Sequence, residues 1–130
     1  MLLDGIRILD CTSMLAGPYC CMMLGDLGAE IIKIEHPKSW DPGRDLGEKY
    51  RDSNDTALFL GANRNKYGIT IDFTSETGRQ IFYKLAKTSD VVVINLRSDV
   101  LERLGLDYNS LKTVKDDIIY CNFSGFGDHD

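Results

Sequence analysis

The sequence of 130 residues lacks the features that mark membrane, secreted and disordered proteins. No apolar run approaches the roughly 20 residues that a membrane-spanning helix needs, and the amino terminus passes directly into a charged pattern without the layout of a signal peptide. Only three prolines occur, and no repeat or low-complexity segment is present. We therefore expect one globular, cytoplasmic domain that has no membrane partner.

Positive charge is also in short supply. The chain carries 15 Lys and Arg residues against 20 Asp and Glu residues, which gives a net charge of −5. Non-specific binding of nucleic acid draws its affinity from a surplus of cations that neutralise phosphates, so no nucleic-acid partner is expected. An anionic ligand must instead be met by a few local cations.

Little in the sequence suggests metal binding or covalent catalysis. No pair among the four cysteines has the C-x-x-C spacing of a zinc or redox site. The adjacent Cys20 and Cys21 lie in an apolar helical pattern, where buried reduced thiols are the expected state. The spacing yields no Ser-His-Asp or Cys-His arrangement, no carboxylate pair and no metal cluster. Neither a catalytic residue nor a metal site is therefore predicted.

Short apolar runs alternate with helical patterns along the chain. The predicted strands lie near residues 6–9, 31–34, 69–71, 91–94 and 118–123. The predicted helices lie near residues 18–27, 78–86, 100–104 and 110–115. The segment 36–56 is rich in Gly, Pro and Asp, which predicts a long mobile excursion. This alternation is typical of an α/β domain with a mainly parallel sheet and flanking helices.

Local patterns give finer expectations. Pro18 suits the first position of a helix, where its missing N–H would have no partner, and Gly17 then fills the capping position. The helix that follows is apolar on nearly every face, which predicts burial between other elements. Thr74 is a capping residue type ahead of the next helix. The run at 91–94 is apolar and β-branched, as a strand buried on both faces requires.

Ligands of a parallel sheet gather at the carboxyl ends of its strands. This rule selects four segments that should converge: 12–18, 35–36, 95–97 and 124–127. The first of them lacks the G-x-G-x-x-G pattern of a dinucleotide-binding loop, and Gly17 alone fits either an anion at a helix start or a tight turn. The basic residues near these ends either meet phosphates or form a solvated face: Arg64, Lys66, Arg97 and Arg103.

Three further side chains allow two interpretations each. His36, which follows a strand-ending carboxylate, is either a phosphate contact or a histidine of a surface loop. Trp40 either stacks on an adenine or anchors the excursion, and anchoring is favoured. His129, which is flanked by two aspartates, suggests acid–base chemistry, but no pocket can be inferred around it and it is given no role.

The order of several strings along the chain resembles class III coenzyme A transferases. The opening strings are LDGIRILD at 3–10, AGP at 16–18 and LGDLGAEIIKIE at 24–35. The later strings are NRNK at 63–66, ITID at 69–72, DVVVIN at 90–95, RLGL at 103–106 and IYCNFSGFG at 119–127. The resemblance covers practically the whole chain.

The resemblance implies a Rossmann-like CoA-binding domain over residues 1–130, the N-terminal part of a large domain, with the catalytic and small-domain segments absent. Family members are much longer and form homo-oligomers as interlocked dimers. They hold no permanent cofactor, because coenzyme A and acyl-CoA are substrates and a carboxylic acid is the acceptor. A catalytic aspartate forms an anhydride and then an aspartyl-CoA thioester. That aspartate is expected downstream of residue 127, so the chain alone is expected to be inactive.

The resemblance also implies positions for the coenzyme A contacts. Carried over residue by residue, these are Met14, Leu15, Ala16, His36, Asn95 and Arg103. Leu15 stands where formyl-CoA transferases have a polar residue, and His36 stands where they have an arginine, which removes a bidentate phosphate contact. The alternatives are a fragment similar to an α-methylacyl-CoA racemase, or a non-catalytic nucleotide-binding module or half-enzyme.

Overall fold

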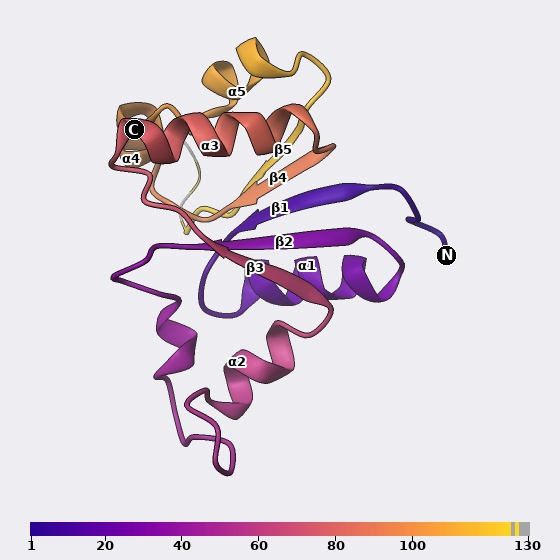
Figure 1. Cartoon of the computed structure of the whole chain (residues 1–130), viewed down its shortest axis with the longest axis vertical. Helices are drawn as coiled ribbons and strands as arrows, with labels where there is room; N and C mark the ends of the chain where they lie inside the picture. The colour runs from indigo at the N-terminus through magenta and orange to yellow at the C-terminus, as the bar shows by residue number, and fades with distance from the viewer. Residues whose placement is uncertain (126, 128–130) are drawn as a thin grey trace.

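A five-stranded parallel sheet forms the centre of the computed structural model, which describes residues 1–125 and 127 (Figure 1). Its strands are β1 (Arg7–Cys11), β2 (Glu30–Glu35), β3 (Lys66–Thr70), β4 (Val91–Ile94) and β5 (Ile119–Asn122). The strand order is β3-β2-β1-β4-β5, and every neighbouring pair is parallel. The predicted parallel α/β sheet is confirmed, and this order is that of the Rossmann-type doubly wound fold.

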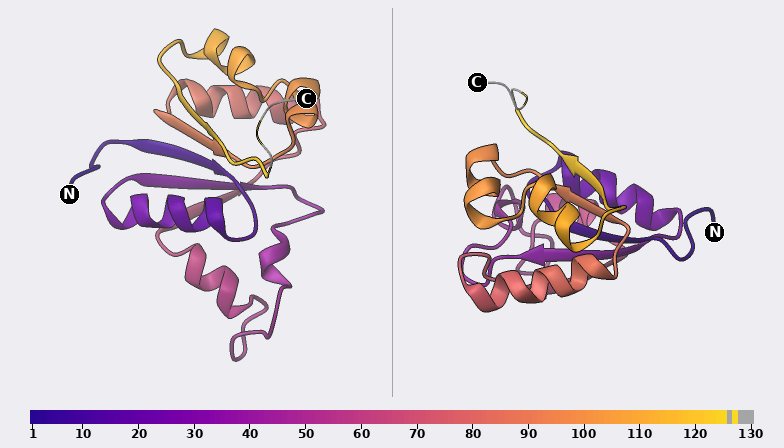
Figure 2. Two further views of the ribbon diagram at one scale, coloured as in Figure 1. Left: turned by 180° about the vertical axis from the view of Figure 1, so that it is seen from behind. Right: turned by 90° about the horizontal axis from the view of Figure 1, so that it is seen from above.

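Helices cover both faces of the sheet (Figure 2). They are α1 (Ala16–Asp26), α2 (Ala57–Ala62), α3 (Glu76–Lys87), α4 (Ser98–Leu104) and α5 (Tyr108–Val114), with a 3-10 turn η1 (Pro42–Arg44). One face carries α1, with α2 beside it, and the other carries α3, α4 and α5. The connections reverse direction between β1 and β4, which is where such sheets place a ligand.

Alternating side chains of the strands build two separate cores. Leu9 and Val92 pack with Phe82 of α3 on one face, whereas Ile8 and Val93 pack with Cys21 of α1 on the other. Successive side chains of a strand point to opposite faces, so β4 contributes to both cores. The predicted burial of β4 on both faces is confirmed, with Val92, Val93 and Ile94 buried.

The predicted start of α1 is wrong by two residues. The helix begins at Ala16, Leu15 occupies the capping position without a side-chain hydrogen bond, and Pro18 is the third helical residue. Proline is tolerated there because the N–H groups of the whole first turn lack helical partners. Gly17 serves a close approach, since an added Cβ would lie 2.5 Å from the Cβ of Thr12.

The predicted burial of α1 on nearly every face is also wrong. Cys21 and Met22 are buried against the sheet, but Tyr19 and Met23 keep 50% and 51% of their surface exposed. Apolar residues on every face of a helix allow burial on every face, but only the faces against which other elements pack are actually buried. The side of α1 that faces away from the sheet therefore presents large apolar side chains.

Other local features also differ from the sequence prediction. Helix α2 was not predicted, because six residues are too few to show a helical period. Strand β3 begins at Lys66 rather than at residue 69, and its outer side chains are exposed because it is an edge strand. Helix α3 is capped by Ser75, whose hydroxyl accepts the Gly78 N–H, and not by Thr74.

Membrane-spanning helices and metal clusters are absent from the described residues. No described helix has the length and apolar character to cross a membrane. Within the same residues, no group of three His, Cys, Asp or Glu side chains is placed to hold a metal ion. All four cysteines are free, and Cys20 is half-buried rather than buried. His129 lies outside the described residues, as does part of the predicted segment 124–127.

Replacing Phe82 tests the larger core. Phe82 is fully buried and packs edge to face on Phe73, with ring centroids 5.2 Å apart. We expect Phe82→Ala to lower the free energy of unfolding by about 3–5 kcal/mol because it removes apolar contacts and leaves a cavity. Urea unfolding followed by circular dichroism measures this, and Ile81→Ala on the exposed side of α3 is the control. Equal losses for the two variants would contradict this account of the core.

Candidate functional site

The carboxyl ends of the strands open on a cavity of about 430 Å³, which we call the edge cavity. Its walls come from the loop after β1, the end of β2, the excursion that follows β2, the segment after β3, and α4. The cavity therefore lies where the fold predicts a ligand, and its volume falls in the range of small-molecule sites.

The first loop, residues 12–15, is fixed by side chains from three strands. The Thr12 N–H donates to Asp10 Oδ1 at 3.0 Å, and the Thr12 carbonyl accepts from Lys33 Nζ at 2.9 Å. Asn95, directly after β4, accepts the Ser13 N–H at 3.1 Å and donates its amide to the Ser13 carbonyl at 3.0 Å. The loop backbone is therefore held before any ligand arrives, and Ser13 lines the cavity.

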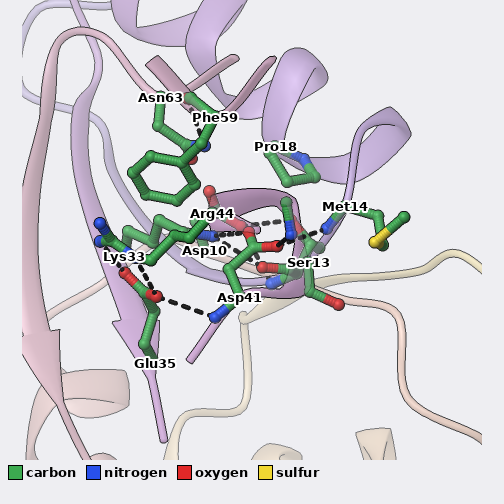
Figure 3. A network of polar contacts seen from close by, with 12 residues as sticks. Asp10, Ser13, Met14, Pro18, Lys33, Glu35, Asp41, Arg44, Phe59 and Asn63 are labelled. Atoms are coloured by element: carbon green, nitrogen blue, oxygen red, sulfur yellow. Dashed lines mark hydrogen bonds and ion pairs between the residues drawn. The ribbon is translucent and has the colours of Figure 1, made fainter. Parts of the chain in front are cut away.

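Asp41 connects the excursion to the first loop (Figure 3). Its Oδ1 accepts the N–H of Met14 at 2.9 Å and that of Gly43 at 2.8 Å. Its Oδ2 forms an ion pair with Lys33 Nζ at 2.9 Å, and both side chains are almost fully buried. The start of the predicted mobile excursion is thus tied to β2 and to the first loop.

A second ion-pair group holds the excursion to the end of β2. Arg44 donates to both oxygens of Glu35, at 2.9 and 2.7 Å, and to Asp55 at 2.6 Å. Its guanidinium lies 3.7 Å above the centre of the Phe59 ring. Burial raises the pKa of Glu35, but hydrogen bonds from Arg44 and from the Asp41 N–H outweigh it and hold that pKa below its usual value.

Lys66 and Arg64 do not line the edge cavity, so the phosphate contact that was one of their two interpretations is not supported. The Lys66 ammonium is buried and donates to Asp10 Oδ2, the Pro18 carbonyl and Asn63 Oδ1, at 2.8, 2.7 and 2.8 Å. Burial lowers the pKa of Lys66 although the Asp10 carboxylate raises it. Arg64 pairs with Asp26 near the end of α1. Both cations are therefore structural.

Arg103 and His36 line the cavity in different states. Arg103 of α4 is exposed, and among the described residues it forms no ion pair. His36 accepts the N–H groups of Lys38 and Ser39 at Nδ1, at 3.1 Å each, and its Nε2 lies 3.5 Å from Asp72. This geometry assigns the proton of a neutral ring to Nε2. Within the cavity wall, Arg103 is therefore a cation whose donors are not used by any described residue and can bind an anion.

The six predicted contact residues divide into two groups. His36 and Arg103 line the edge cavity. Asn95 does not line it, and its side-chain amide is hydrogen-bonded to the backbone of Ser13. Met14, Leu15 and Ala16 lie at the exposed tip of the first loop and at the start of α1, outside the cavity wall. The structure thus brings the ends of β1, β2 and β4 together and leaves these three residues beside the cavity.

Sequence reasoning missed several cavity residues. Apolar side chains of Leu96, Val100 and Leu104 line the cavity. Val100 and Leu104 are one helical turn apart, and this spacing indicates that they share one face of the helix. Trp40 also lines it, 54% exposed, and its indole N–H donates to Asp45 within the same excursion, so the favoured anchoring to the body of the domain is not observed. Asp41 gave no signal, because a carboxylate in a Gly- and Pro-rich segment looks solvated.

A smaller cavity of about 300 Å³ shares Glu35, His36 and Trp40 with the edge cavity. Its cation, Arg44, is already paired with Glu35 and Asp55. The edge cavity has an unpaired cation and an apolar wall, so it is the better candidate for an anionic ligand that carries an aromatic ring.

The fold and this cavity define the chain as a doubly wound α/β domain with an anion-compatible site at its topological switch point. A sequence model of CoA-transferase family III matches residues 3–130, and the chain belongs to this family.

Known relatives agree with this assignment. The chain is 42% identical over 125 residues to a mouse (Mus musculus) succinyl-CoA:glutarate CoA-transferase, with 96% of this chain and 28% of the relative covered. It is 38% identical over 130 residues to a succinate–glutarate CoA-transferase of Agrobacterium fabrum, with 96% and 32% covered. A crystal structure of a CAIB/BAIF family protein from Brucella suis superposes with a TM-score of 0.91 at 38% identity, covering 98% of this chain and 34% of the other. The chain therefore spans about a third of the length of these relatives.

The Glu35–Arg44 pair predicts a specific dependence of stability on pH. Folding lowers the pKa of Glu35, so the ionised carboxylate stabilises the folded state. This stabilisation is fully present above the pKa of an unfolded glutamate, about 4.3, and is lost as the pH falls through the lower pKa of the folded state. We expect the urea midpoint of the parent to fall between pH 5 and 3, and that of Glu35→Gln to fall less. Glu48→Gln, on the exposed part of the excursion, is the control. A slope for Glu35→Gln equal to the parent slope would refute the prediction.

Proposed function

We propose that the edge cavity binds the nucleotide part of coenzyme A, and that the whole protein transfers coenzyme A from an acyl-CoA to a carboxylic acid. The single observation that carries the binding proposal is the guanidinium of Arg103, which pairs with no described residue and lies in a cavity at the switch point of the sheet. Family membership supports the choice of ligand.

The chemistry of the cavity suits this ligand. Coenzyme A carries phosphates, which an exposed arginine binds with charge-assisted hydrogen bonds. It also carries an adenine, which can lie against the apolar side chains of Leu96, Val100 and Leu104. The net charge of −5 gives no general attraction for phosphates, so the electrostatic attraction must come from the local guanidinium of Arg103.

We place the covalent step outside residues 1–130. In this proposal an aspartate elsewhere in the whole protein attacks the thioester carbonyl, which forms a mixed anhydride and releases the coenzyme A thiolate. The thiolate then attacks the aspartyl carbonyl, giving an aspartyl-CoA thioester and the free acid of the donor. The acceptor carboxylate then attacks the aspartyl-CoA thioester, which forms a second mixed anhydride and releases the coenzyme A thiolate. The thiolate attacks the acceptor carbonyl of this anhydride, which forms the new acyl-CoA and frees the aspartate carboxylate. The chain described here contributes binding to this sequence and no nucleophile.

Removing one guanidinium tests the binding proposal. We expect Arg103→Gln to weaken the binding of coenzyme A by about tenfold or more, because a hydrogen bond to a charged group contributes about 1.5–3 kcal/mol. Isothermal titration calorimetry measures the Kd. Arg97→Gln is the matched control, because Arg97 is 83% exposed on the same segment and pairs with Asp99. Equal affinities for the parent and Arg103→Gln, or no binding by the parent, would count against the proposal.

The assignment of the nucleophile gives a separate prediction. The 130-residue chain, incubated with succinyl-CoA and glutarate, is expected to form no glutaryl-CoA above the rate without protein. Chromatography of the CoA esters measures this. Sustained exchange by the chain alone would place a catalytic group within residues 1–130 and contradict the assignment.

A further inference from the structure

We propose that Asp41 is a positioning residue of the coenzyme A site, and that it acts through the acceptor Oδ1 rather than through its charge. Its carboxylate holds the first loop in the shape that borders the edge cavity. The proposal rests on the proposed function for the identity of the ligand, whereas its claim about the loop stands on geometry alone.

One oxygen of Asp41 connects two segments that are far apart in the sequence. Oδ1 accepts the Met14 N–H at 2.9 Å from the first loop and the Gly43 N–H at 2.8 Å from η1. The side chain is only 1% exposed, so water does not compete for these bonds. Figure 3 shows the Asp41 carboxylate between the first loop and the end of β2.

The conformation of Met14 makes this bond necessary. Met14 has φ of 73°, a left-handed conformation that side chains other than glycine rarely adopt. Such a residue keeps this conformation only where its surroundings impose it. Asn95 holds the neighbouring Ser13 from both sides, and Asp41 holds Met14 itself. Without the Asp41 acceptor, Met14 can relax and alter the loop that carries Ser13 into the cavity wall.

The packing of η1 supports a fixed arrangement. A Cβ added to Gly43 would lie 3.1 Å from Asp41 Oδ1 and 3.4 Å from the Met14 carbonyl, so the two segments touch through their backbones. The Gly43 carbonyl accepts the buried Thr56 hydroxyl at 2.6 Å, which fixes η1 to the start of α2. The backbone around Asp41 is therefore fixed by these contacts.

Substituting Lys33 together with Asp41 separates the effect of the Asp41 charge from the effect of its Oδ1 acceptor. Lys33 is 3% exposed and contacts both Asp41 Oδ2 and the Thr12 carbonyl. Removing one partner of a buried ion pair leaves an uncompensated charge, whereas replacing both partners is often tolerated. Paired substitutions can therefore delete the charges without leaving one behind.

Three variants of the full chain test the proposal. The double variant Lys33→Met, Asp41→Asn removes both charges and keeps the Oδ1 acceptor. The double variant Lys33→Met, Asp41→Leu removes the charges and the acceptor. Asp41→Glu keeps the charge and displaces the acceptor by one methylene, which keeps the test available if the leucine variant does not fold. Asp52→Asn, an exposed change of the same chemistry in the same excursion, is the control.

The first measurement needs no ligand. Hydrogen exchange of the Met14 amide, followed by NMR, is expected to be at least about tenfold faster than in the parent when the acceptor is lost or displaced. The Lys33→Met, Asp41→Asn variant also lacks the Lys33 bond to the Thr12 carbonyl, so it is compared with the Lys33→Met, Asp41→Leu variant and should exchange at least about tenfold more slowly than that variant. The control should retain the protection of the parent. Equal protection of Met14 in the parent and in the folded acceptor variants would overturn the proposal.

The second measurement is titration with coenzyme A. Asp41→Glu should bind about tenfold more weakly than the parent or worse, and the Lys33→Met, Asp41→Leu variant should bind about tenfold more weakly than the Lys33→Met, Asp41→Asn variant, because these two differ only in the acceptor. Faster Met14 exchange with unchanged affinity would overturn the positioning role. A loss of affinity in the asparagine variant equal to that in the leucine variant would assign the effect to charge and also overturn it. Failure of the parent to bind would instead count against the proposed function, and the exchange measurement would still decide the role in the loop.

Discussion

Two buried lysines determine how the loops at the candidate site are arranged. Lys33 reaches Asp41 and the Thr12 carbonyl, and Lys66 reaches Asp10 and the Pro18 carbonyl. A buried ammonium without a partner costs several kcal/mol, so each lysine requires its acceptors to be in place. Those acceptors belong to the first loop, the first turn of α1 and the excursion after β2. The folding of the sheet, which buries the lysines, therefore also fixes the loops at its carboxyl edge.

This pairing explains why few polar groups of the site remain for a ligand. Arg44 forms ion pairs with Glu35 and Asp55, and the Nδ1 of His36 accepts hydrogen bonds from two backbone N–H groups. Arg103 differs because it stands on α4, on the other side of the sheet from α1, and it forms no ion pair with any described residue. A guanidinium that keeps its donors unpaired is suited to bind phosphate.

The sequence predicted most of the fold and only part of the site. The strands were found because β4 and its neighbours are short, apolar and β-branched, and the boundaries of β3 and α2 were missed where those signals are weak. The convergence of Ser13, His36 and Asn95 followed from the rule for parallel sheets. The role of Asp41 could not be predicted, because its burial depends on how the excursion folds back, and local sequence carries no information about that contact.

A hydrogen-bond acceptor at position 41 has a physical reason that is separate from the ion pair. The site must bind two N–H groups, of Met14 and Gly43, from different segments at a point without access to water. An apolar side chain would leave both donors unsatisfied, and a hydroxyl brings a proton of its own that needs an acceptor. A carboxylate is acceptor-only, but burying it requires a cation nearby, which Lys33 provides from β2. Lys33 therefore compensates the charge of the carboxylate, whereas the two lone pairs of Oδ1 hold the N–H groups of Met14 and Gly43 and stabilise the left-handed backbone of Met14.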